Sequence, residues 1–173
     1  IKGFKVQTLA SDTAASGLAS ATWASGSALN TARTWLAGTG IQTASLAFGG
    51  EEPPDSGKTE SYNGSSWTEV ADLNLARYAL AGSGTYTAAL AYGGYVAPAP
   101  RAQTEVWNGS AWTEVSDLNT ARYGLGGSST SSTAAIAFGG DAPPGVQTVA
   151  ETWNGSSWTE VGDLNTARKE IGG

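Results

Sequence analysis

The chain contains no cysteine, no histidine and no methionine among its 173 residues. Without cysteine no disulfide can form. Without cysteine and histidine the chain also lacks the usual ligands for zinc and copper, and the usual pairs of nucleophile and base. We therefore expect no cofactor, no metal site and no catalytic residue.

Charge is also scarce, at 14% of the residues, where about a quarter is usual in soluble domains. Fifteen acidic residues against nine basic ones give a net charge of −6, and no basic patch gathers anywhere. A nucleic acid is therefore not an expected partner. No apolar run reaches the roughly 18 residues that a membrane span needs, and no segment keeps a helical apolar period. We expect neither a membrane span nor helices.

What the chain has in abundance is internal repetition. The motif LNTAR, once as LNLAR, ends at Arg33, Arg77, Arg122 and Arg168, with spacings of 44, 45 and 46 residues. Each arginine follows a tryptophan by ten residues, and these are Trp23, Trp67, Trp112 and Trp158. An apolar run ending in Gly-Gly follows at residues 43–50, 87–94 and 133–140.

Each repeat predicts four short strands, which we call a, b, c and d. Strand a follows the arginine, strand b runs into Gly-Gly, strand c is TEVW or its equivalent, and strand d is WTEV. A period near 45 residues with four strands is typical of one blade of a β-propeller.

Strands c and d enclose Asn-Gly, a strong hairpin signal. If the loop is only Asn108 and Gly109, Glu105 faces Trp112. If the loop has four residues, Trp107 faces Trp112 instead. Because side chains alternate along a strand, both registers place Glu105, Trp107, Trp112 and Glu114 on one face. Both tryptophans are therefore predicted to enter one seam between blades.

These anchors resemble the Kelch repeat over about residues 22–173. The order is Arg77, then Gly93 and Gly94, then Trp107 and Trp112, and Tyr62 keeps the tyrosine that Kelch repeats usually carry in the third strand. The resemblance implies structural roles for the repeated positions Arg33, Arg77, Arg122, Arg168, Trp23, Trp67, Trp112, Trp158, Trp107, Trp153 and Tyr62. The sequences of the repeats, such as WNGSSWTE and TASLAFGG, resemble tail-fibre-like proteins of marine bacteriophages, and so does the opening IKGFKVQTLASD.

We expect one all-β domain over residues 1–173, a Kelch-like β-propeller with blades of about 45 residues. It comprises a partial blade at 1–40, blades at 33–70, 77–115 and 122–161, and the first strand of a composite fourth blade at 164–173. Residues 3–9, 16–20 and the segment around Trp23 would supply the other strands of that blade. The alternatives are a piece of a longer ring, or chains that associate into a homo-oligomer to complete one.

The repeated arginines allow two interpretations. Each arginine pairs with a repeated acid such as Glu105 or Asp117 and joins adjacent blades. Alternatively, the four form a ring of guanidinium groups near the axis that binds an anion, as sialidase propellers do.

The repeats differ most in the connections between strands b and c, at residues 51–58, 95–102 and 141–148, which hold all six prolines. We call these the b–c loops. Because strands alternate in direction, they share a face with the arginine-bearing d–a connections. Stiff and varied loops on a rigid frame suit recognition. The candidate ligand-binding residues are Tyr95, Val96, Arg101, Glu51, Glu52, Asp55 and Asp141.

We expect a non-enzymatic binding or structural module, in a phage tail fibre or another virion component. It would recognise a host-surface glycan or another virion protein through the b–c loops, on the virion or outside the cell. One alternative is an intracellular Kelch adaptor, which would be cytoplasmic. A second is a glycan-active propeller enzyme.

Overall fold

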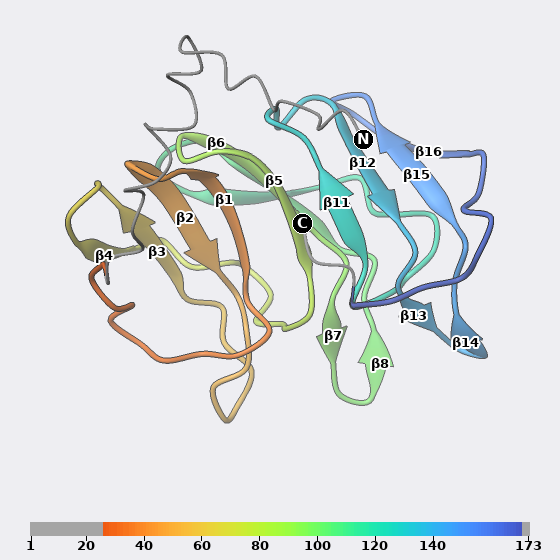
Figure 1. The fold of residues 1–173 in the computed structure, drawn as a ribbon, viewed down its shortest axis with the longest axis horizontal. Coiled ribbons are helices and arrows are strands. Elements are labelled where there is room, and N and C mark those ends of the chain that lie inside the picture. Colours follow the sequence, from red (N-terminus) through yellow and green to blue (C-terminus); the bar gives the residue numbers. More distant parts are fainter. Residues whose placement is uncertain (1–25, 171–173) are drawn as a thin grey trace, which may run out of the picture.

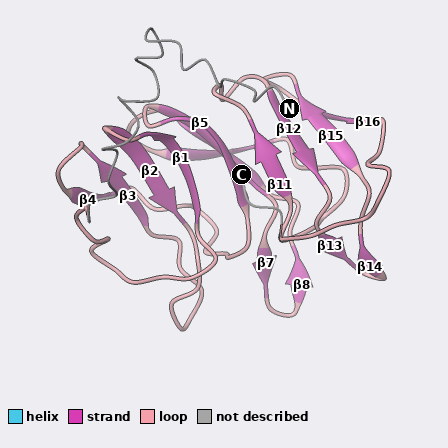
Figure 2. Cartoon of the chain, viewed as in Figure 1, coloured by secondary structure: helices cyan, strands magenta, loops and turns pink. Residues whose placement is uncertain are grey.

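The computed structural model describes residues 26–170, which form an all-β fold without a helix in that range (Figure 1). Three antiparallel sheets of four strands follow one another along the chain (Figure 2). Residues 26–170 contain no helix that is long and apolar enough to cross a membrane. The all-β prediction is confirmed. Trp23 and the strands expected in residues 1–20 lie outside the described residues.

The strands of each sheet lie in chain order, as the repeat predicts. The first sheet contains β1 (Ala37–Ile41), β2 (Ala44–Phe48), β3 (Thr59–Tyr62) and β4 (Trp67–Val70). The second contains β5 (Ala81–Thr85), β6 (Ala88–Tyr92), β9 (Thr104–Trp107) and β10 (Trp112–Val115). The third contains β11 (Gly126–Ser128), β12 (Ala135–Phe138), β15 (Ala150–Trp153) and β16 (Trp158–Val161).

Two small hairpins extend from the second and third sheets, and the sequence did not predict them. They are β7 (Tyr95–Val96) with β8 (Ala99–Pro100), and β13 (Asp141–Ala142) with β14 (Gly145–Val146). Both lie within b–c loops and project on the same side of the molecule (Figure 1). The b–c loop of the first sheet instead closes through a bridge between Glu51 and Asp55.

The hairpin between β9 and β10 has a four-residue loop. Trp107 pairs with Trp112 and Glu105 with Glu114, so the two-residue register is wrong. Asn108 decides the loop length, because its Oδ1 accepts hydrogen bonds from the backbone N–H groups of Ser110 at 2.9 Å and Ala111 at 3.0 Å. This side-chain turn takes the place of a tight type I′ turn.

The apolar core lies in the seams between neighbouring sheets rather than within one sheet. Trp107 and Trp112 belong to one buried cluster with Leu46 and Phe48 of the first sheet, and Phe48 meets Trp112 at 5.0 Å between ring centroids. The indole Nε1 of Trp112 donates across the seam to Thr59 Oγ1 at 3.0 Å. The next seam repeats this arrangement with Tyr92, Thr104, Trp153 and Trp158.

The d–a connections, which we call linkers, bring the sheets together around one point. Two residues after each repeated arginine the backbone takes a left-handed φ, at Trp35, Ala79, Gly124 and Glu170. The N–H of Ala79 donates to the carbonyl of Trp35, that of Gly124 to Ala79, and that of Glu170 to Gly124, at 2.8, 2.8 and 2.7 Å. All four residues line one shallow hollow. Among the inner strands that follow the linkers, β5 therefore lies beside both β1 and β11.

Candidate functional site

The repeated arginines fix the linkers to the sheets. Arg77 is fully buried; its Nη1 donates to Glu105 Oε1 at 2.5 Å and its Nε to the carbonyl of Gly93 at 2.9 Å. The other carboxylate oxygen of Glu105 accepts the N–H and the side-chain amide of Asn74, both at 2.8 Å. Burial lowers the pKa of Arg77, and the carboxylate beside it opposes that change. The Glu105 carboxylate thus binds both polar residues of the LNxAR motif, Asn74 and Arg77.

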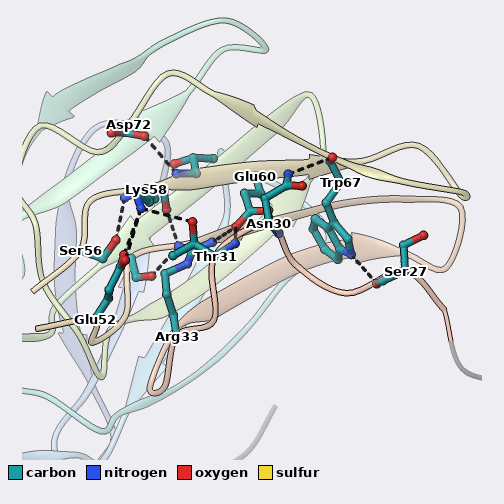
Figure 3. A network of polar contacts seen from close by, with 12 residues as sticks. Ser27, Asn30, Thr31, Arg33, Glu52, Ser56, Lys58, Glu60, Trp67 and Asp72 are labelled. Atoms are coloured by element: carbon teal, nitrogen blue, oxygen red, sulfur yellow. Dashed lines mark hydrogen bonds and ion pairs between the residues drawn. The ribbon is translucent and has the colours of Figure 1, made fainter.

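The same contacts recur in the other two sheets. Arg33 pairs with Glu60 at 2.8 Å, and Arg122 pairs with Glu151. Figure 3 shows Asn30 and Arg33 converging on Glu60, with Trp67 directed at Ser27. Each arginine binds the sheet that follows its linker.

This arrangement contradicts the anion-ring interpretation for three of the four arginines. The side chains of Arg33, Arg77 and Arg122 are buried and paired, so they present no guanidinium ring to a ligand. Asp117, the other acid proposed as a partner, accepts the backbone N–H of Thr104 at 3.3 Å. Arg168 is exposed, and its Nε donates to the carbonyl of Thr166.

The linkers and the b–c loops share one face, as predicted. Two-way backbone bridges join the residue after each arginine to the residue after each Gly-Gly pair. These bridges link Thr34 with Glu51, Tyr78 with Tyr95, and Tyr123 with Asp141. These backbone bridges are the same in all three sheets, but the side chains that they bring together differ. We call this surface the loop face.

Three tyrosines form a continuous row on the loop face. Tyr78 and Tyr95 have ring centroids 5.5 Å apart, and Tyr95 and Tyr123 have centroids 5.0 Å apart. All three are half-buried. We call this set the tyrosine row. Because neighbouring rings are in contact, each ring restricts the rotation of the next.

Charged side chains stand at both ends of the tyrosine row. At one end the carboxylates of Glu51 and Asp55 add to partial burial in raising the pKa of Tyr78. At the other, Asp141 Oδ2 accepts the hydroxyl of Tyr123 at 3.2 Å and the Lys169 ammonium at 2.8 Å. The hydrogen bond from Lys169 is the main cause that lowers the pKa of Asp141. Asp141 is therefore ionised at neutral pH and held in place by two donors.

A groove opens beside the row, between the two small hairpins. Its volume is about 460 Å³, within the range of about 300–1,000 Å³ that is usual for small-molecule sites. Tyr95, Tyr123 and Asp141 line it together with Pro98, Pro100, Pro143, Pro144 and Gly145. The prolines of two different b–c loops thus form its walls.

The residues predicted to bind a ligand are placed differently from one another. Tyr95 and Asp141 meet in the groove through Tyr123. Glu51 and Asp55 lie at the far end of the row, while Glu52 forms a half-exposed ion pair with Lys58 at 3.1 Å. Val96 pairs with Ala99 within its hairpin.

Arg101 mainly supports the loop backbone: its N–H donates to Gly94 and its carbonyl accepts from Arg122. Its Nε is buried without a hydrogen-bond partner in the described part of the chain.

Sequence reasoning missed Tyr78, Tyr123 and Lys169. The signal was available, because the residue directly after the repeated arginine is Thr34, Tyr78, Tyr123 or Lys169 while the motif before it hardly changes. A position that varies beside a fixed motif belongs with the varied b–c loops.

A second cavity of about 490 Å³ lies between the inner strands β1, β5 and β11. Its described lining offers only apolar side chains, glycine backbone and the hydroxyls of Thr39, Ser128, Ser129 and Thr130. Nor do three acidic side chains gather into a possible metal site anywhere in residues 26–170.

No protein-family model matches the chain, and no curated protein matches it in sequence. The loop face is therefore interpreted from its own chemistry.

Proposed function

We propose that the chain is a non-enzymatic binding module of a phage tail fibre or related virion component, and that it attaches to its partner through the loop face. The observation that carries the proposal is the tyrosine row. Its side chains stand at the positions that vary, on a backbone that the repeat holds constant. Rigid aromatic side chains give a large contact area at little entropic cost, and such residues dominate binding surfaces.

The charge and composition of the site favour binding over catalysis. A glycan-active enzyme of the usual kind needs two acids facing one bond. Along the tyrosine row, Asp141 is already bound to Tyr123 and Lys169, and the central cavity is lined by hydroxyl and apolar groups. The virion setting rests on the resemblance of the repeats to marine phage proteins, and it places the module on the virion surface.

The proposal includes a closed Kelch-like propeller of four blades, whose fourth blade combines the two ends of the chain. The segment 162–170 supports it, because it repeats the bonds of the earlier linkers. Leu164 donates to Thr148 and Arg168 to Gln147, while the carbonyl of Arg168 accepts from Gly140. At the other end, Asn30 donates to Glu60 and to the carbonyl of Trp67, as Asn74 does to Glu105 and Trp112. Trp35 and Glu170 then meet at one hollow.

The experiment is to measure how a fluorescently labelled chain adheres to a panel of marine bacterial isolates, before and after their surface polysaccharide is removed. We expect adhesion to a subset of strains, and we expect a variant of the loop face to lose it. Adhesion that survives changes to the loop face would contradict the proposal. Adhesion that survives polysaccharide removal but needs the loop face would instead indicate a protein partner.

A further inference from the structure

The groove between the two small hairpins has features of a saccharide site. It combines an aromatic surface with fixed polar groups at its rim. Tyr95 and Tyr123 give the aromatic part, and the Tyr123 hydroxyl together with the Asp141 carboxylate gives the polar part. A pyranose ring matches this pattern, because it carries C–H bonds on its faces and hydroxyls around its edge. The negative face of an aromatic ring attracts C–H groups.

We propose that this groove binds a neutral saccharide, with a sugar ring lying against Tyr95 and Tyr123 and a sugar hydroxyl donating to Asp141. This inference rests on the proposed function and names the ligand class for the loop face.

Charge favours a neutral ligand over an acidic one. The chain carries a net charge of −6, and Glu51, Asp55 and Asp141 flank the tyrosine row. The ammonium group of Lys169, which contacts the groove residue Asp141, is already paired with that carboxylate at 2.8 Å. A carboxylated, sulfated or phosphorylated saccharide would meet repulsion from these carboxylates.

The spacing of the rings favours a sugar over a proline-rich peptide. A polyproline II helix repeats every three residues, or about 9 Å, and its binding sites provide separate slots between aromatic rings. In the tyrosine row the ring centroids are only 5.5 and 5.0 Å apart. Neighbouring rings touch at interplanar angles of 52° and 67° and leave no slot between them, so a ligand contacts the face of one ring and the edge of the next.

The probe is an array of neutral, amino-bearing and acidic saccharides, followed by titration of the chain with the strongest neutral one. The informative variants are Tyr95→Ala and Tyr123→Thr, the second of which copies Thr34 at the equivalent position. The matched control is Tyr86→Ala, because Tyr86 is 46% exposed and lies in the turn between β5 and β6, at the opposite end of the sheet. All three variants should melt close to the parent.

We expect each variant of the row to weaken neutral saccharide binding by about tenfold or more, the loss that follows when an aromatic stacking contact is removed. Tyr86→Ala should bind as the parent does. Array binding confined to acidic saccharides would overturn the inference, and so would no saccharide binding, unchanged affinity in both row variants, or preferential binding of a proline-rich peptide.

The outcomes also separate this inference from the proposed function. If adhesion to cells needs the loop face but no saccharide binds, the proposed binding module holds and the proposed saccharide ligand is wrong. If saccharides bind but Tyr86→Ala alone removes the binding, both proposals are wrong.

Discussion

Tryptophan and arginine have separate tasks in each repeat. Trp112 fills a seam between two sheets and donates to Thr59 across it. Arg77 fixes a linker by pairing with Glu105 under the surface. The tryptophan contact depends on apolar burial and shape. The arginine contact depends on the pairing of two buried, opposite charges.

The change Trp112→Ala should lower the free energy of unfolding by about 3–5 kcal/mol, because it empties an aromatic site in a packed seam. Chemical denaturation measures this loss. The matched control is Trp35→Ala, since Trp35 is 49% exposed and alanine already stands at the equivalent position 79. Equal losses in the two variants would show that the seam does not depend on Trp112.

The change Arg77→Met should lower the free energy of unfolding by about 3–5 kcal/mol, because Glu105 would remain buried without its counter-charge. Binding through the loop face should hardly change in the protein that stays folded. The double variant Arg77→Met with Glu105→Leu should recover a large part of the loss. A single variant as stable as the parent would show that the ion pair contributes nothing.

Tyr92 links stability to alkaline pH. Burial raises its pKa to about 12 from the ordinary value of 10.0, against the smaller influence of its hydrogen bond with Ser83. The raised folded pKa stabilises the protein fully below pH 10, and this contribution is lost as the pH rises to about 12. Its size is on the order of 3 kcal/mol.

The variant Tyr92→Phe removes this titrating group and copies Phe48 and Phe138, which hold the same position in the other sheets. We expect the parent to lose more stability than the variant between pH 10 and pH 12 in parallel melting series. If parent and variant lose the same stability between pH 10 and pH 12, the raised pKa of Tyr92 is wrong.

At the scale of elements, the strands were predictable and the loops were not. Strands c and d begin and end where TEVW and WTEV do, because three aligned copies repeat the same alternation of inward and outward residues. The length of the turn depends on how the Asn108 side chain bonds, and both registers satisfied the alternation. The hairpin β7–β8 lies in Pro-rich sequence, which gives no periodic signal.

The candidate site was half predictable for the same reason. Tyr95 and Asp141 were found because the b–c loops visibly differ between copies. Tyr78 and Tyr123 were missed because they directly follow the nearly invariant LNTAR motif. The backbone bridges that bring them beside the b–c loops are visible only in the structure.

An exchange of loops tests whether frame and recognition are separable. Replacing residues 95–103 with the sequence of 141–149 keeps the loop length and a two-stranded hairpin, but it puts aspartate in place of Tyr95. We expect a melting temperature close to that of the parent and a marked loss of adhesion to the strains that retain the parent. A large fall in melting temperature would show that the loops contribute to the frame.

At the scale of the molecule, the proposed closure predicts how the chain depends on its ends. The chain should be a monomer of 17.5 kDa by native mass spectrometry. A variant that lacks residues 1–20 should melt at a lower temperature or self-associate, because it would leave two seam faces uncovered. If that variant keeps the melting temperature and mass expected of a monomer, the composite blade is wrong.

The central claim is that a constant frame presents one recognition surface, the loop face. Hydroxyl-radical footprinting of the chain on the cells that retain it tests this most directly, because tyrosines on both ends of the sheets report in one measurement. We predict that Tyr78, Tyr95 and Tyr123 become protected on binding, while Tyr86 at the opposite end stays as reactive as in the free chain. Protection of Tyr86 without protection of the tyrosine row would contradict the claim.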